Sequence, residues 1–145
     1  MRRLLALLLL TAAPSASAIG FEVDVAGGYW FTGTPQFQLR LGVHQHLARL
    51  GERASLKGAL RSGVFLNTAG SRIGIPLDLA LELHFNPVSF GVVGGPWFHF
   101  SDGDVVRAHI GGEFGVRLGR FVRISVEVGW LQPAPLLLGR FGVMF

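Results

Sequence analysis

The sequence lacks cysteine altogether, so its 145 residues can form neither a disulfide framework nor a cysteine-ligated metal site. It also lacks the run of about 20 apolar residues that a membrane-spanning helix requires. Charge is scarce as well: beyond residue 18, eleven basic residues stand against nine acidic ones. This small positive excess argues against nucleic-acid binding, and the sequence has no phosphate-binding or nucleotide-binding motif.

The first 18 residues have the pattern of an export signal. Arg2 and Arg3 precede an apolar stretch over residues 4–10, and Ala16-Ser17-Ala18 offers the small residues that a signal peptidase needs. The alternative is a membrane anchor, but the apolar stretch is too short to span a bilayer. We therefore expect a cleaved signal peptide over residues 1–18 and a single domain over residues 19–145.

Apolar residues alternate with small or charged ones through most of that domain. In segment 73–85 the odd-numbered positions are all Ile, Leu or Phe, while the even-numbered positions include Asp78 and Glu82. Successive side chains of a strand point to opposite faces, so one face of this segment is wholly apolar. Seven other segments follow the same rule, at residues 20–31, 36–47, 55–66, 88–100, 105–118, 121–131 and 136–145. The pattern predicts an all-β fold, an eight-stranded antiparallel up-and-down transmembrane β-barrel with short loops.

Ionisable residues decide which face of these segments points inward. They fall on the small-residue face, and the apolar face carries none. A soluble barrel, such as a lipocalin-like periplasmic binding protein, would turn its charges outward and its apolar face inward. The inverse arrangement, with the apolar face toward lipid and the charges in a narrow lumen, suits a membrane barrel better.

Hairpin arithmetic predicts which charges meet, because opposed residues of an antiparallel pair have a constant sum of residue numbers. Connections folded symmetrically about 67–72, 132–135 and Thr34 oppose unlike charges, which favours these registers. The connection between segments 105–118 and 121–131 opposes like charges, and this is tolerable only within one mixed cluster. The predicted lumen charge pairs are Lys57 with Glu82, Arg61 with Asp78, Glu127 with Arg140, Asp24 with His44, and Glu22 with His46. Such a network would close the narrow lumen to ions.

Aromatic residues gather near the ends of the segments, as they do at the two interfaces of a membrane. One expected girdle holds Tyr29, Trp30, Phe31, Phe37, Trp97, Phe98, Phe100 and Trp130, and the other holds Phe21, Phe85, Phe90 and Phe145. Pro96 falls on the outward face of a strand that has no free edge. We therefore expect a bulge or a lost ladder bond beside it.

The last segment carries the most specific resemblance. Phe141, Val143 and Phe145 alternate up to the final residue, and this resembles the terminal strand of bacterial outer-membrane β-barrels. In that family the strand is a membrane-insertion signal for the barrel assembly machinery. The whole domain resembles the small eight-stranded barrels typified by the membrane domain of outer-membrane protein A. The resemblance implies a monomer without cofactor in the bacterial outer membrane, with outer-membrane lipid and lipopolysaccharide as partners.

The expected function is that of a closed barrel that contributes to the envelope and is not an enzyme. One alternative rests on His99, Ser101 and Glu113, whose spacing is similar to that in outer-membrane lipid A 3-O-deacylases. By resemblance these residues would form a hydrolytic triad, in which Ser needs a base and the base needs an orienting carboxylate. A second alternative is a transition-metal site, since three inward-facing histidines could converge: His44, His46 and His84.

Overall fold

The computed structural model describes residues 19–68, 72–100 and 106–145, which form eight β-strands. The strands are β1 (Ile19–Trp30), β2 (Thr34–Arg49), β3 (Ala54–Asn67), β4 (Arg72–Phe85), β5 (Val88–His99), β6 (Val106–Leu118), β7 (Val122–Leu131) and β8 (Ala134–Met144). No helix in these ranges is long and apolar enough to cross a membrane. The predicted signal peptide, residues 1–18, lies outside the described residues.

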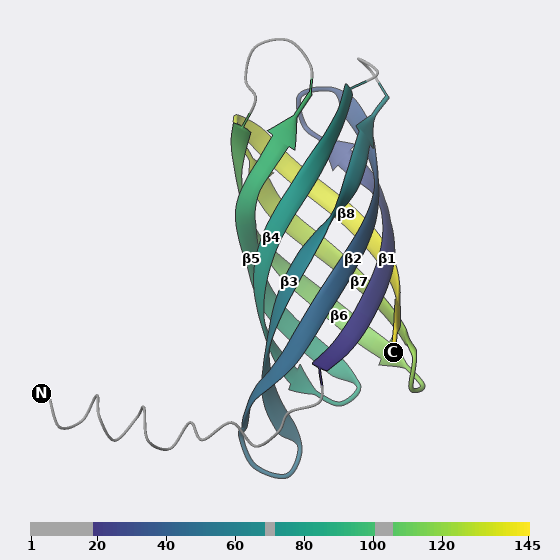
Figure 1. The fold of residues 1–145 in the computed structure, drawn as a ribbon, viewed down its shortest axis with the longest axis vertical. Coiled ribbons are helices and arrows are strands. Elements are labelled where there is room, and N and C mark those ends of the chain that lie inside the picture. The colour runs from purple at the N-terminus through teal and green to yellow at the C-terminus, as the bar shows by residue number, and fades with distance from the viewer. Residues whose placement is uncertain (1–18, 69–71, 101–105) are drawn as a thin grey trace, which may run out of the picture.

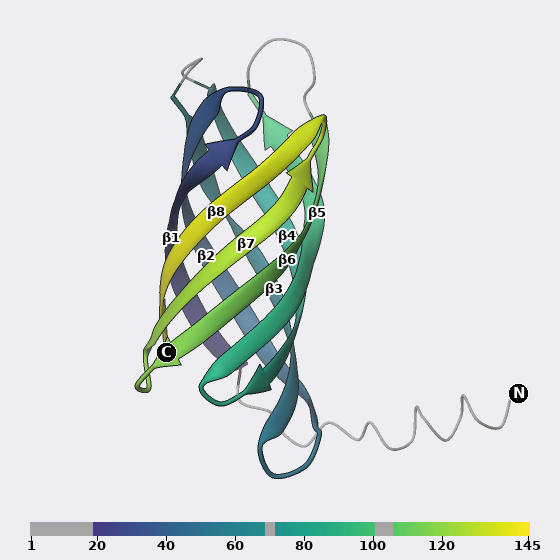
Figure 2. The ribbon, with the colours of Figure 1, turned by 180° about the vertical axis from the view of Figure 1, so that it is seen from behind.

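The strands form one closed antiparallel barrel, in which neighbours in sequence pair and β1 pairs with β8. Figures 1 and 2 show from two sides how the strands tilt around the barrel. β1 begins and β8 ends at the same end, where the backbone N–H groups of Phe21 and Phe145 each donate to the other's carbonyl oxygen. We call this the terminal end and the opposite one the far end. The predicted fold class, an eight-stranded antiparallel up-and-down barrel, is confirmed.

The two faces of the barrel wall differ in chemistry, as the alternation predicted. Outward positions hold large apolar side chains, and Leu79, Ile110 and Val128 are each more than 60% exposed. Every Asp and Glu within the eight strands points inward and is at most 7% exposed. This arrangement is the inverse of a soluble barrel. The lipocalin-like alternative is therefore wrong.

Tight turns set the register of the first and last hairpins. The β1–β2 turn comprises only residues 31–33, where Gly33 has a φ of 99° that favours glycine. The β7–β8 turn comprises only Gln132 and Pro133. Both turns are shorter than the connections predicted from the sequence, so each residue lies opposite a different partner in the ladder. The shifts are even in residue number, and each side chain therefore keeps its inward or outward direction.

The ladder between β4 and β5 is interrupted beside Pro96. Leu77 and Asp78 would lie opposite Pro96 and Gly95, but these residues are not paired. The register is the same on both sides of the gap, so pairing is lost without a bulge. A Cβ on Gly95 would lie 1.9 Å from the carbonyl oxygen of Leu77, and only glycine fits so close an approach. The prediction of lost ladder pairing beside Pro96 is therefore confirmed.

Candidate functional site

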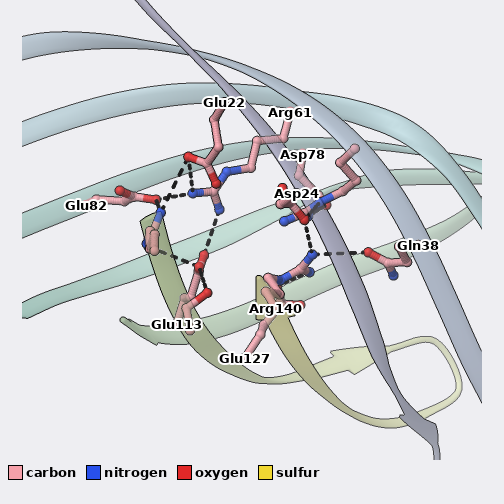
Figure 3. A network of polar contacts seen from close by, with 12 residues as sticks. Glu22, Asp24, Gln38, Arg61, Asp78, Glu82, Glu113, Glu127 and Arg140 are labelled. Carbon is pink, nitrogen blue, oxygen red and sulfur yellow. Dashed lines mark hydrogen bonds and ion pairs between the residues drawn. The ribbon is translucent and has the colours of Figure 1, made fainter. Parts of the chain in front are cut away.

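Inward-facing charged side chains form two clusters in the lumen, which Figure 3 shows as two groups of sticks. The Arg61 cluster consists of Glu22, Arg61, Glu82, Glu113 and Arg123. The Arg140 cluster consists of Asp24, Arg40, Asp78, His109, Glu127 and Arg140. Along β1, Glu22 comes before Asp24 and therefore lies nearer the terminal end. The two clusters occupy successive levels of the barrel.

Two guanidinium groups hold the Arg61 cluster together. Arg61 donates from Nη1 to Glu113 Oε2 at 2.7 Å and from Nη2 to Glu82 Oε1. Arg123 bridges the same two carboxylates, with Nη1 2.9 Å from Glu82 Oε1 and Nη2 3.0 Å from Glu113 Oε1. The Ser125 hydroxyl donates to Glu113 at 2.6 Å. Charges therefore alternate around this cluster, although the β6–β7 ladder opposes Glu113 to another glutamate.

The Arg140 cluster is a chain of alternating charge. Arg140 donates from Nε to Glu127 Oε2 at 3.1 Å and from Nη1 to Asp24 Oδ1 at 3.3 Å. Arg40 continues the chain, since its Nε donates to Asp24 Oδ1 and its Nη1 to Asp78 Oδ2, both at 3.2 Å. Glu127 and Arg140 thus lie in contact, although the ladder does not oppose them. All five side chains are at most 4% exposed.

His109 closes this chain into a ring. Its Nδ1 lies 2.8 Å from Asp78 Oδ1 and its Nε2 lies 2.8 Å from Glu127 Oε1. The Nδ1 contact has the geometry of a hydrogen bond, whereas the Nε2 contact meets only the distance of an ion pair. The two clusters together bring six carboxylates against four guanidinium groups, and the imidazoles of His84 and His109 contact three of these carboxylates. Sequence reasoning missed His109, although it shares a strand face with Glu113.

In this lumen, residues that lie opposite each other on neighbouring strands are not the residues that form ion pairs. Lys57 lies directly across from Glu82, and Arg61 lies directly across from Asp78. Arg61 nevertheless pairs with Glu82 and with Glu113, and Lys57 has no ion pair among the described residues. The strands tilt around a narrow barrel, so a long side chain can reach diagonal and cross-lumen partners. Hairpin arithmetic considers only neighbours on the wall and cannot detect such contacts.

The pairs predicted between β1 and β2 are wrong. The ladder opposes Asp24 to Arg40 instead of His44, and it opposes Glu22 to a glycine instead of His46. The cause is the short β1–β2 turn, which leaves both histidines farther toward the terminal end. The metal-site alternative gains no support, because the described residues contain no group of three His, Asp or Glu side chains able to hold a metal ion.

The proposed hydrolytic triad is not assembled. Glu113 lies opposite Gly91, which comes eight residues before His99 on β5. At about 3.3 Å per residue this separates the two side chains by roughly 26 Å along the wall. His99 instead packs its ring against Phe65, with 4.8 Å between ring centres. Ser101 lies outside the described residues. Glu113 therefore cannot orient His99, and the triad of the three named residues is not supported.

Between the Arg140 cluster and the far-end opening, the lumen is filled mainly by apolar side chains. Six buried side chains pack together there and form what we call the apolar cap: Trp30, Phe65, Trp97, Leu131, Leu136 and Leu138. Two hydrogen bonds satisfy the indole groups of the cap. Trp30 donates to the carbonyl oxygen of Leu131 at 2.9 Å, and Trp97 donates to Asp78 at 3.0 Å. The second bond joins the cap to the Arg140 cluster.

The cap corrects the expected aromatic girdle. Trp30 is 3% exposed and Trp97 is fully buried, so neither faces lipid. Tyr29 and Trp130, by contrast, are exposed at 41 and 47%, as girdle residues should be. Strand parity could have separated the two groups, because Trp30 shares its face of β1 with the inward-facing Asp24. Proximity to a loop predicts the direction of an aromatic side chain less well than strand parity does.

The terminal residues Phe141, Val143 and Phe145 belong to the outward face. Phe141 and Phe145 are 47 and 70% exposed, and Val143 pairs with Val23 of β1. These positions continue the apolar band of the barrel wall. Their role as a membrane-insertion signal stays a prediction.

No protein-family model matches this sequence, and no curated protein matches it either. Solved structures do match the fold. A structure from the de novo design of transmembrane β-barrels is 15% identical, covers 87% of this chain and 95% of its own, and has a TM-score of 0.61. The solution structure of the designed TMB2.3 is 19% identical, covers 88 and 94%, and has a TM-score of 0.56. The crystal structure of the outer membrane enzyme PagL is 12% identical, covers 86 and 98%, and has a TM-score of 0.53.

These similarities establish a membrane β-barrel fold. They also correct the expectation that this chain is not an enzyme, because PagL has the same fold and is an outer-membrane enzyme. At such low identity the likeness concerns the fold alone. The narrower resemblance to outer-membrane protein A stays a prediction.

Proposed function

We propose that this chain is an integral barrel of the bacterial outer membrane whose lumen is closed to ions. The observation that carries the proposal is the division of the wall, with large apolar side chains outside and every strand carboxylate inside. Lipid is the solvent that such an outer face requires, because a band of exposed Leu, Val, Ile and Phe is unstable in water. The barrel thus contributes a sealed, lipid-embedded body to the envelope.

Three successive layers of side chains support the closed lumen. Below a pocket of about 430 Å³ that opens at the far end, the apolar cap fills the lumen, and the Arg140 and Arg61 clusters fill the levels below the cap. The interior of an eight-stranded barrel is just wide enough for side chains to fill. An ion passing through would have to separate buried charges from their partners. Each buried charge left without a partner costs several kcal/mol.

The proposed partners are lipid and lipopolysaccharide on the outside of the barrel, and the assembly machinery that inserts it. We place the terminal end in the periplasm, as in other bacterial barrels with an even number of strands. We also propose that the barrel is a monomer; its closed sheet leaves no strand edge through which another copy could extend it.

The lipid-facing assignment can be tested with single cysteines, because the chain has none of its own. A spin label at Leu79→Cys in the middle of β4 should be relaxed by oxygen, which dissolves in lipid, and protected from a water-soluble nickel chelate. A label at Glu52→Cys in the β2–β3 turn is the control and should respond to nickel. Nickel access at residue 79 of the vesicle-embedded barrel would refute the proposal. Recovery of the expressed chain in the inner-membrane fraction would refute the outer-membrane location alone.

A further inference from the structure

The balance of charge in the lumen changes at the terminal end. Beyond the Arg61 cluster, the lumen opens into a pocket of about 190 Å³. Five basic side chains line this pocket, which we call the basic mouth: His46, Arg53, Lys57, His84 and Arg117. They come from β2, the β2–β3 turn, β3, β4 and β6. Because β3 and β6 are not neighbours in the barrel, the pocket lies across the opening of the lumen.

Among the described residues, no carboxylate neutralises the charge of Arg53, Lys57 and Arg117 in the basic mouth. Glu82 is engaged at Oε1 by the guanidinium groups of Arg61 and Arg123, and its Oε2 lies 2.8 Å from His84 Nε2, so among the side chains of the mouth it pairs with His84 alone. Lys57 and Arg117 form no ion pair within the described part of the chain, and no described Asp or Glu lines the pocket. Several cations held close together without a counter-charge attract an anion strongly, especially beside a low-dielectric wall.

We propose that the basic mouth binds a phosphate group. Lysine and arginine side chains only donate hydrogen bonds, and the planar guanidinium fork of Arg53 or Arg117 matches two phosphate oxygens at once. Ser55 and Asn86 also line the pocket and add neutral donors. Its volume of about 190 Å³ leaves room for one partly hydrated phosphate group.

Two sources could supply this phosphate, namely a free phosphate compound in the periplasm and the headgroup of an anionic phospholipid. Phe85 follows His84 on β4 and is 44% exposed on the outside of the barrel, where it marks the level of the membrane interface. A lipid headgroup lies at that level. The lipid source rests on the proposed membrane location, whereas binding of free phosphate by the folded barrel in detergent does not.

The test uses the barrel folded in micelles of an uncharged detergent. Inorganic phosphate is added at constant ionic strength against chloride, and the amide NMR signals of residues 53–57, 84–86 and 88 are followed. A second series adds a short-chain phosphatidylglycerol to the micelles, with phosphatidylcholine as the zwitterionic comparison. Saturable shifts confined to the terminal end are expected in at least one series.

Matched variants decide whether the basic mouth is responsible. The double variant Lys57→Met with Arg117→Met should weaken the response tenfold or more, since it removes two charged donors. Arg72→Met at the far end is the control and should leave the response unchanged. If the double variant does not fold, Arg53→Gln in the exposed turn should weaken binding several-fold on its own.

Each outcome assigns a source or overturns the proposal. A response to inorganic phosphate that these variants weaken supports a site for free phosphate. A response to phosphatidylglycerol alone, weakened by the same variants, supports a headgroup site. The proposal is wrong if neither series saturates, or if the variants bind as well as the original chain. Failure of both series leaves the closed membrane barrel standing, because that proposal is tested by spin-label accessibility.

Discussion

The apolar cap and the two charged clusters fill the same lumen but are stabilised by different physics. Members of both are almost completely buried, with Leu138 and Arg40 each at 0% exposure. The cap is stabilised by van der Waals contact and by the removal of apolar surface from water, and neither effect depends strongly on the orientation of the side chains. The clusters stabilise the barrel only while each charge keeps its partners, because an isolated buried charge destabilises the folded state by several kcal/mol. The comparison teaches that equal burial does not mean equal tolerance of substitution.

The largest expected effect is at the centre of the Arg61 cluster. Arg61→Met should lower the free energy of unfolding by about 3–5 kcal/mol, because it removes one of the two cations that Glu82 and Glu113 share and leaves the buried carboxylates of the cluster with Arg123 alone. A urea titration of the barrel in lipid vesicles, followed by the gel mobility of folded and unfolded forms, measures the change. Arg120→Met, in the exposed β6–β7 turn, should stay within about 0.5 kcal/mol. Equal effects at the two positions would contradict the charged lumen.

A middle-sized effect is expected where the cap meets the Arg140 cluster. Trp97→Phe keeps an aromatic ring in the cap but removes the indole N–H that donates to Asp78 at 3.0 Å. The loss of a hydrogen bond to a carboxylate should cost about 1.5–3 kcal/mol in the same urea titration. Trp130→Phe on the outward face is the matched control and should cost less. If the order of these two variants is reversed, the cap is misplaced.

The smallest effect is expected inside the cap. Phe65→Leu replaces one buried apolar side chain with another of similar size and leaves no polar group unpaired, so it should cost less than about 1.5 kcal/mol. Leu138→Met on β8 should likewise cost less than about 1.5 kcal/mol. A loss as large as that of Arg61→Met, in the same assay, would show that cap and clusters do not differ in tolerance.

Strand positions and faces could be predicted because a period of two is a local property. Every strand boundary falls within two residues of the predicted segment, and the inward direction of Asp78 and Glu82 follows from the alternation alone. The register of β1 against β2 could not be predicted, because it depends on whether the turn uses three residues or more. Sequence alternation does not contain that information.

The ion pairs themselves were the least predictable part of the lumen. Arg40 reaches Asp78 from β2 to β4, and Arg61 reaches Glu113 from β3 to β6, so neither contact joins neighbouring strands. Such partners depend on the tilt and diameter of the closed barrel and on side-chain length. Trp30 and Trp97 were predicted on the lipid face for a different reason. Their nearness to a loop suggested a girdle, although their strand parity places them in the lumen.

The central claim, that cap and clusters together seal the lumen, is tested most directly by current through single barrels in a planar lipid bilayer. The purified chain is inserted under an applied voltage, and a wide-pore barrel in the same bilayer confirms that insertion is detected. We predict no current steps above the lipid baseline, because apolar side chains and paired charges fill the passage. A steady open-channel current in molar salt would show that ions pass the cap and both clusters, and would contradict the account.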